Sequence, residues 1–142
     1  MPANAPKVLL RSEQSDGVLS VIELTGSGTP PLHRHDFDET FCVLEGELTF
    51  HLDGELFTRR AGEVAFAPRG VPHTYANLSG ASARALLVCT PAGFERYFDR
   101  IAANITGVQP PPEAAKPIPE VITLGPPIGE PHQTDDLERR QR

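Results

Sequence analysis

Short apolar runs separated by glycine and proline are the feature that most restricts the fold of this chain. Glycine and proline account for 12 and 15 of its 142 residues, and both interrupt helices and mark turns. The apolar runs between them have the length of strands and fall at residues 18–24, 32–37, 40–44, 48–52, 56–58, 64–67, 74–76 and 83–89. This spacing predicts an all-β fold, an antiparallel sandwich or barrel, and the length fits a single domain.

The strand pattern gives way to a helical one near the end of the last run. Apolar residues then recur at the spacing of one helical face, at Phe94, Phe98, Ile101 and Ile105. They predict one amphipathic helix over about residues 93–104, which lays its apolar stripe against the outside of the sheets. Docking to a membrane or to a partner is the alternative for such a stripe. The strands and this helix together form the unit at residues 1–106.

A proline-rich tail follows over residues 107–142. Its eight prolines are Pro110, Pro111, Pro112, Pro117, Pro119, Pro126, Pro127 and Pro131. Proline has no backbone N–H to donate, so the tail cannot form a packed helix or a central strand. We expect it to run extended over the surface or onto a neighbouring subunit, with residues 121–124 able to pair as a strand.

Charge and composition exclude several classes of protein. The 13 basic and 19 acidic side chains give a net charge of −6, which argues against a nucleic-acid-binding protein. The longest apolar stretch has the size of a strand, so no membrane span is expected. No secretory signal is visible at the start, and we expect a soluble cytoplasmic protein in which Cys42 and Cys89 are reduced and buried.

The residues with the clearest chemistry lie between positions 30 and 41. His33 and His35 are two residues apart, so in an extended chain both side chains point to the same face, and Glu39 joins them if the chain stays extended. Two imidazoles and a carboxylate that converge are typical of a first-row transition-metal site. A second segment, in which glycine and proline bend the chain sharply, supplies His73 as a fourth candidate ligand.

The spacing of these two segments resembles the pair of signature motifs of the cupin superfamily. The first reads His33-x-His35-x3-Glu39-x6-Gly46, and the second reads Gly62-x5-Pro68-x-Gly70-x2-His73-x3-Asn77. The resemblance covers about residues 18–91 and is specific because both motifs are present. It departs at Gly28, which lies five positions before His33 where the usual pattern has six. The region from Gly70 to Phe98 further resembles small single-domain bacterial cupins described as quercetin-dioxygenase-like.

The resemblance implies a jelly-roll β-barrel of about six to eight strands with one divalent transition metal ion inside. The implied metal ligands are His33, His35, Glu39 and His73, and the ion is Fe, Mn, Ni, Co or Zn. It also implies a homodimer. Phe41, Phe50, Phe66 and Tyr75 are either the lining of a substrate pocket or plain barrel core.

Three functions fit these features. The first is a metal-dependent oxygenase that acts on a small aromatic or enolic substrate, with Glu39 as both a ligand and a catalytic base by resemblance. The second is a metal-dependent isomerase, epimerase or lyase, in which the metal stabilises an enolate. The third is a module that binds a small molecule without turnover. We favour the oxygenase because the set of four ligands is intact.

Overall fold

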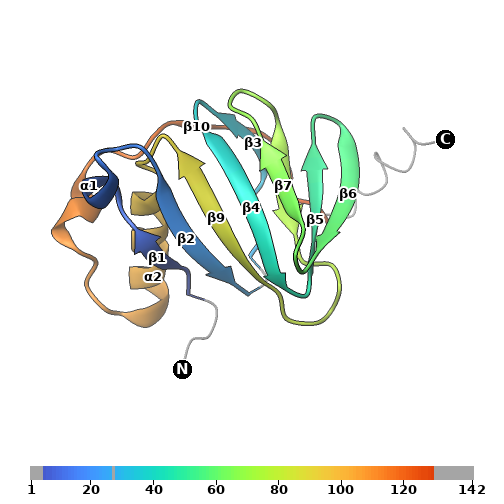
Figure 1. The fold of residues 1–142 in the computed structure, drawn as a ribbon, viewed down its shortest axis with the longest axis horizontal. Coiled ribbons are helices and arrows are strands. Elements are labelled where there is room, and N and C mark those ends of the chain that lie inside the picture. Colours follow the sequence, from blue (N-terminus) through green and yellow to red (C-terminus); the bar gives the residue numbers. More distant parts are fainter. Residues whose placement is uncertain (1–4, 27, 130–142) are drawn as a thin grey trace.

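Two antiparallel sheets of five strands each make up most of the computed structural model, which describes residues 5–26 and 28–129 (Figure 1). The first sheet contains, in spatial order, β1 (Lys7–Leu10), β2 (Ser20–Thr25), β9 (Arg84–Thr90), β4 (Asp38–Glu45) and β7 (Val64–Ala67). The second contains β10 (Val121–Gly125), β3 (Leu32–His35), β8 (His73–Ala76), β5 (Glu47–Leu52) and β6 (Glu55–Arg60). The expected all-β jelly-roll architecture is confirmed, with ten strands among the described residues.

Alternation along each strand places one side chain in the core and the next outside it. In β4, Phe41 and Val43 are almost fully buried, and Cys42 between them is half-buried on the other face. Leu87 of β9 and Phe50 of β5 reach the same core from the two sheets. Burial of such apolar surface is the main favourable term in folding, at roughly 25 cal/mol per Å².

Glycine is required at the two turns that flank β5. Gly54 follows Asp53, and both have positive φ angles, of 83° and 49°, as the tight turn between β5 and β6 demands. Gly46, just before β5, has a φ of 71°, and a Cβ there would collide with the carbonyl oxygen of Ser82. The glycine of the first motif therefore allows two backbones to approach closely.

The C-terminal helix α2 (Glu95–Thr106) lies on the inner side of the first sheet, so the expectation that it covers the outside is wrong. Phe94 at its start and Phe98 within it belong to the same buried cluster as Ile22 of β2. The helix contacts β1 and β2, and Figure 1 shows it behind these two strands. It fills the inner face where the first sheet would otherwise expose apolar residues to water.

Two elements near the N-terminus were not expected from the sequence. β1 pairs with β2, and the single-turn helix α1 (Ser12–Ser15) follows it. At the other end, the expected strand at residues 121–124 is confirmed as β10, which pairs with β3 after the 3-10 turn η1 (Pro112–Ala115). The tail therefore supplies an edge strand to the second sheet.

Both cysteines are free thiols, with Cys89 buried and Cys42 half-buried. Among the helices of residues 5–26 and 28–129, none has the length and apolar character needed to cross a membrane.

Candidate metal centre

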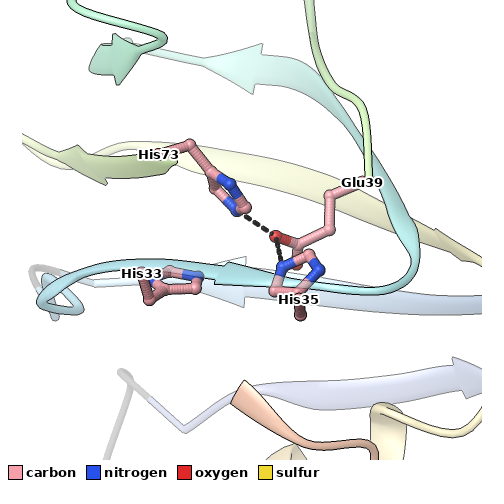
Figure 2. A group of neighbouring side chains, drawn as sticks. All are labelled: His33, His35, Glu39 and His73. Atoms are coloured by element: carbon pink, nitrogen blue, oxygen red, sulfur yellow. Dashed lines mark hydrogen bonds and ion pairs between the residues drawn. The ribbon is translucent and has the colours of Figure 1, made fainter. Parts of the chain in front are cut away.

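Four side chains from three strands meet inside the barrel (Figure 2). They are His33 and His35 of β3, Glu39 of β4 and His73 of β8, and all four are buried. One nitrogen or oxygen atom of each lies within 4.8 Å of the corresponding atoms of the other three. The sequence pattern named the same four residues as ligands, and the structure brings all of them together.

Strand geometry explains three of the four positions. In β3, His33 and His35 point inward while Arg34 between them is exposed, as alternation requires. β8 runs antiparallel beside β3, with His33 directly opposite His73. The histidine of the second motif therefore lies beside those of the first because β8 and β3 pair in this register, although the two motifs are far apart in sequence.

Glu39 reaches the site by a different route from the one expected. The chain does not stay extended after His35, because it bends at residues 36–37 and crosses from the second sheet to the first. Glu39 then faces His35 from the opposing sheet, with its Oε1 atom 2.9 Å from the Nε2 atom of His35. Glu39 therefore joins the cluster, but it lies opposite the histidines rather than beside them.

Backbone carbonyls fix the orientation of every imidazole in the site. The Nδ1 atoms of His33, His35 and His73 lie 2.6, 2.9 and 3.0 Å from carbonyl oxygens, which belong to Pro31, Phe37 and Val71. A carbonyl can only accept a hydrogen bond, so each Nδ1 carries the proton. In the neutral imidazole the Nε2 lone pair is then free to face the centre, which is the usual arrangement of histidines that bind metal.

The Oε1 atom of Glu39 contacts two of these nitrogens at once. It lies 2.9 Å from His35 Nε2 and 2.7 Å from His73 Nε2, drawn as dashed lines in Figure 2. Lone pairs that face one another so closely require a cation between them, either a proton or a metal ion. Three imidazole nitrogens and one carboxylate oxygen suit a first-row divalent metal.

The electrostatics of the site favour an ionised carboxylate. When a proton rather than a metal ion lies between these atoms, burial raises the pKa of Glu39, but hydrogen bonds from His35 and His73 outweigh it, and the pKa falls to about 2. Burial lowers the pKa of His33, which favours its neutral form. Burial also acts to lower the pKa of His73, but its hydrogen bond to Glu39 prevails and the pKa is raised. The centre therefore combines a fixed negative charge with imidazoles directed at one point.

A cavity of about 740 Å³ opens beside the centre, and His33 and Glu39 form part of its wall. Most of the remaining wall is apolar, including Leu24, Leu48, Phe94, Phe98, Ile101 and Ile118. Apart from the site residues, Arg84 is the one charged side chain that the described residues contribute to this wall, and it forms ion pairs with Glu23 and Glu45. The cavity therefore suits a small uncharged molecule.

The structure separates the four aromatic residues that the sequence proposed for the pocket. Tyr75 lines the cavity. Phe41 and Phe50 are buried in the core and pack against each other, with ring centroids 5.1 Å apart, so they do not line it. Placing Phe66 in the pocket is wrong, because it is 51% exposed. In β7 the alanines take the inner positions, and alternation turns Phe66 outward.

Sequence reasoning missed the contribution of the helix to the cavity wall. Phe94, Tyr97, Phe98 and Ile101 line it from one side. The spacing of the apolar residues in α2 was visible in the sequence, but nothing in that spacing indicates which face of a sheet a helix covers.

Comparison with known proteins finds one matching family and several similar proteins. Residues 20–89 match the family model described as the cupin domain. The chain is similar to the quercetin 2,3-dioxygenase of Bacillus subtilis (strain 168), with 38% identity over 71 residues, which cover 47% of this chain and 21% of the relative. It is also similar to the endoribonuclease YbeY of Myxococcus xanthus (strain DK1622), with 40% identity over 62 residues, 44% of this chain and 21% of the relative. The chain thus spans about one fifth of the length of these curated relatives.

A solved structure shows the same fold. The polyketide cyclase RemF from Streptomyces resistomycificus superposes with a TM-score of 0.53 and 27% identity, covering 60% of this chain and 63% of that chain. The family match at residues 20–89 includes all four site residues.

Proposed function

Since the chain belongs to the cupin superfamily through its domain at residues 20–89, we propose that it is a metal-dependent oxygenase that acts on a small aromatic or enolic substrate. One observation carries the proposal: four buried metal-binding side chains converge at the end of a large apolar cavity. The converging nitrogen and oxygen atoms would bind a metal ion, and the cavity beside them would hold an organic substrate.

The Nε2 atoms of His33, His35 and His73 and a carboxylate oxygen of Glu39 would hold the ion. When bound, a redox-active divalent metal polarises substrate oxygens and supports chemistry with dioxygen. The chain itself orients the ligands through the three backbone carbonyls and excludes water through the apolar wall. A site held in this way needs little rearrangement when a substrate enters.

Glu39 has a second role in this proposal. Its Oε1 atom makes both contacts with histidines, which leaves Oε2 without a hydrogen bond from the described residues. Because Glu39 also forms part of the cavity wall, this second oxygen is positioned to accept a hydroxyl proton as the substrate binds. The contacts with His35 and His73 lower the pKa of Glu39, so the carboxylate is ionised and can accept a hydrogen bond from an enol or phenol hydroxyl.

The character of the cavity supports an uncharged substrate of drug-like size or smaller. Its volume of about 740 Å³ lies within the usual range for small-molecule sites, roughly 300–1,000 Å³. The similarity to a protein named quercetin 2,3-dioxygenase supports an oxygenase. The similarity to a polyketide cyclase favours a second candidate, a metal-dependent reaction such as isomerisation or elimination in which no oxygen is consumed.

Two measurements, made one after the other, test the proposal. Elemental analysis of protein purified without a histidine tag should find about one transition-metal ion per chain. His73→Ala should lose most of the metal while circular dichroism shows a folded barrel. His51→Ala is the matched control for loss of a buried imidazole, since His51 is also buried but lies outside the four-residue cluster. Equal metal content in wild type and His73→Ala contradicts the ligand assignment.

Oxygen consumption then separates the candidate reactions. With quercetin as the probe, the metal-loaded wild type should consume oxygen in step with loss of the flavonol absorbance. Glu39→Gln should abolish this, and Glu55→Gln, an exposed change in β6, should not. Turnover of quercetin without oxygen uptake would contradict the oxygenase and favour the second candidate, a metal-dependent reaction that consumes no oxygen. Binding without turnover would leave a non-catalytic binding protein.

A further inference from the structure

Tyr75 presents a polar group to the otherwise apolar wall of the cavity. It lies in β8 two residues after His73, so both side chains point to the inner face of the second sheet. Its ring packs against Phe41, with centroids 5.0 Å apart, and it lines the same cavity as His33 and Glu39. The packing of the ring fixes where the phenol group sits relative to the metal-binding side chains.

The hydroxyl of Tyr75 has no hydrogen-bond partner among the residues that the structure describes. Among residues 5–26 and 28–129, no side chain or backbone group forms a hydrogen bond with it, whereas the backbone carbonyl of Tyr75 accepts one from Thr29 at 2.6 Å. A hydroxyl in an apolar wall destabilises the protein relative to phenylalanine unless it finds an acceptor. The neighbouring core positions hold phenylalanine, at Phe41 and Phe50, so a phenol at position 75 indicates an acceptor on the ligand.

Two other polar side chains of the wall are already engaged. Arg84 is held by Glu23 and Glu45, and Thr29 is bonded to the backbone of Tyr75. Tyr97 also lines the cavity, but its side chain comes from α2 and the residue is 42% exposed. Tyr75 is therefore the donor that a buried ligand meets close to the metal-binding residues.

We propose that Tyr75 is a specificity-determining residue whose hydroxyl donates a hydrogen bond to a second oxygen of the substrate. This inference rests on the proposed function, in which the first oxygen of the substrate lies at the His33, His35, Glu39 and His73 centre. A donor beside that centre, within a mostly apolar wall, selects neutral aromatic or enolic molecules that carry two adjacent oxygens. Catechols and α-hydroxyketones are of this class, and molecules with a single oxygen are not.

Equilibrium binding to zinc-loaded protein tests the inference without turnover, because zinc has no redox chemistry. Isothermal titration compares catechol, which has two adjacent oxygens, with phenol, which has one. Tyr75→Phe should weaken catechol binding by about three- to tenfold, the usual effect of losing one neutral hydrogen bond. Phenol binding should change by less than about twofold. Thr58→Val, which removes a hydroxyl in β6 outside the cavity wall, is the control and should leave both affinities unchanged.

Three results overturn the inference. One is unchanged catechol binding by Tyr75→Phe, and another is an equal loss for catechol and phenol, which would indicate a packing role. The third is failure of catechol to bind wild-type protein. Zinc content and circular dichroism of each variant confirm that the centre and the fold are intact. The oxygen measurement with quercetin remains independent, so catechol selectivity without oxygen uptake would contradict the oxygenase and leave the role of Tyr75 in place.

Discussion

The attachment of α2 to the barrel depends on one buried carboxylate, and its replacement should destabilise the protein strongly. Glu95 is fully buried at the start of α2. Its Oε2 atom accepts hydrogen bonds from the backbone N–H and the hydroxyl of Ser12, at 2.8 and 2.5 Å. Its Oε1 atom accepts one from the N–H of Gly93 at 2.7 Å. This one side chain therefore connects α1, the turn after β9 and α2, which forms a wall of the cavity.

The magnitude for Glu95→Gln follows from these three bonds. An amide retains one acceptor oxygen, so the two bonds to Ser12 become neutral and weaker, and the new NH₂ group faces the N–H of Gly93. Loss of one hydrogen bond to a charged acceptor costs about 1.5–3 kcal/mol, and weakening two others costs about 0.5–1 kcal/mol each. The free energy of unfolding should fall by about 2.5–5 kcal/mol. For a domain of this size, Tm should fall by about 10 °C.

The effect should also depend on pH in a defined direction. Burial raises the pKa of Glu95, but the hydrogen bonds from Ser12 and Gly93 outweigh it and the pKa is lowered. A carboxyl whose pKa is depressed in the folded state stabilises the protein above its ordinary pKa of about 4.5, and this contribution is lost as pH falls through the folded-state value. Glutamine does not titrate, so the difference between wild type and variant should shrink as pH falls below about 4.5.

Urea unfolding followed by circular dichroism measures both effects. Glu120→Gln, an exposed change in the tail, serves as the control for loss of one negative charge and should shift the free energy of unfolding by less than about 0.5 kcal/mol. A loss below about 1 kcal/mol for Glu95→Gln at pH 7, or a difference that grows on acidification, would refute the reasoning.

Three further predictions address the core, the thiols and the metal. Phe41→Ala should lower the free energy of unfolding by about 3–5 kcal/mol because Phe41 is 1% exposed, while Phe66→Ala, 51% exposed, should cost less than about 1 kcal/mol in the same urea titration. In native protein a thiol reagent should modify Cys42 and spare Cys89, since burial raises the pKa of the Cys89 thiol and blocks access; equal rates of reaction would contradict this. Dialysis from pH 7 to about pH 5 should release the metal, because imidazoles bind metal only when neutral, and elemental analysis that finds it retained would argue against histidine ligands.

Much of the fold could be predicted because its signals are local. Turns such as Asp53-Gly54 end strands by their backbone preferences, and these preferences act over a few residues. The strand at Val64–Ala67 has the predicted bounds. The N-terminal strand β1 and the short helix α1 were missed because four-residue elements carry too little pattern to stand out from a mixed, polar segment.

The candidate site was predictable to a different degree for each residue. The pair of motifs named four side chains as metal ligands, and the structure brings these four together. The pocket aromatics were predicted less well, since residue type cannot distinguish an inward Tyr75 from an outward Phe66. That distinction depends on the parity of each strand relative to the core, and a shift of one residue reverses it.

The sequence by itself determined the chemical identity of the site and the strand-by-strand character of the fold. The types of side chain and their spacing are properties of each segment. They can be recognised without knowing which segments lie side by side in space. The tertiary structure decided how these segments meet. The register of His33 against His73 and the crossing of the chain between the sheets before Glu39 bring the four side chains to one point. The placement of α2 on the inner face of the first sheet then made the apolar cavity beside them. These are long-range contacts, set by which arrangement buries the most apolar surface, and no local pattern specifies them.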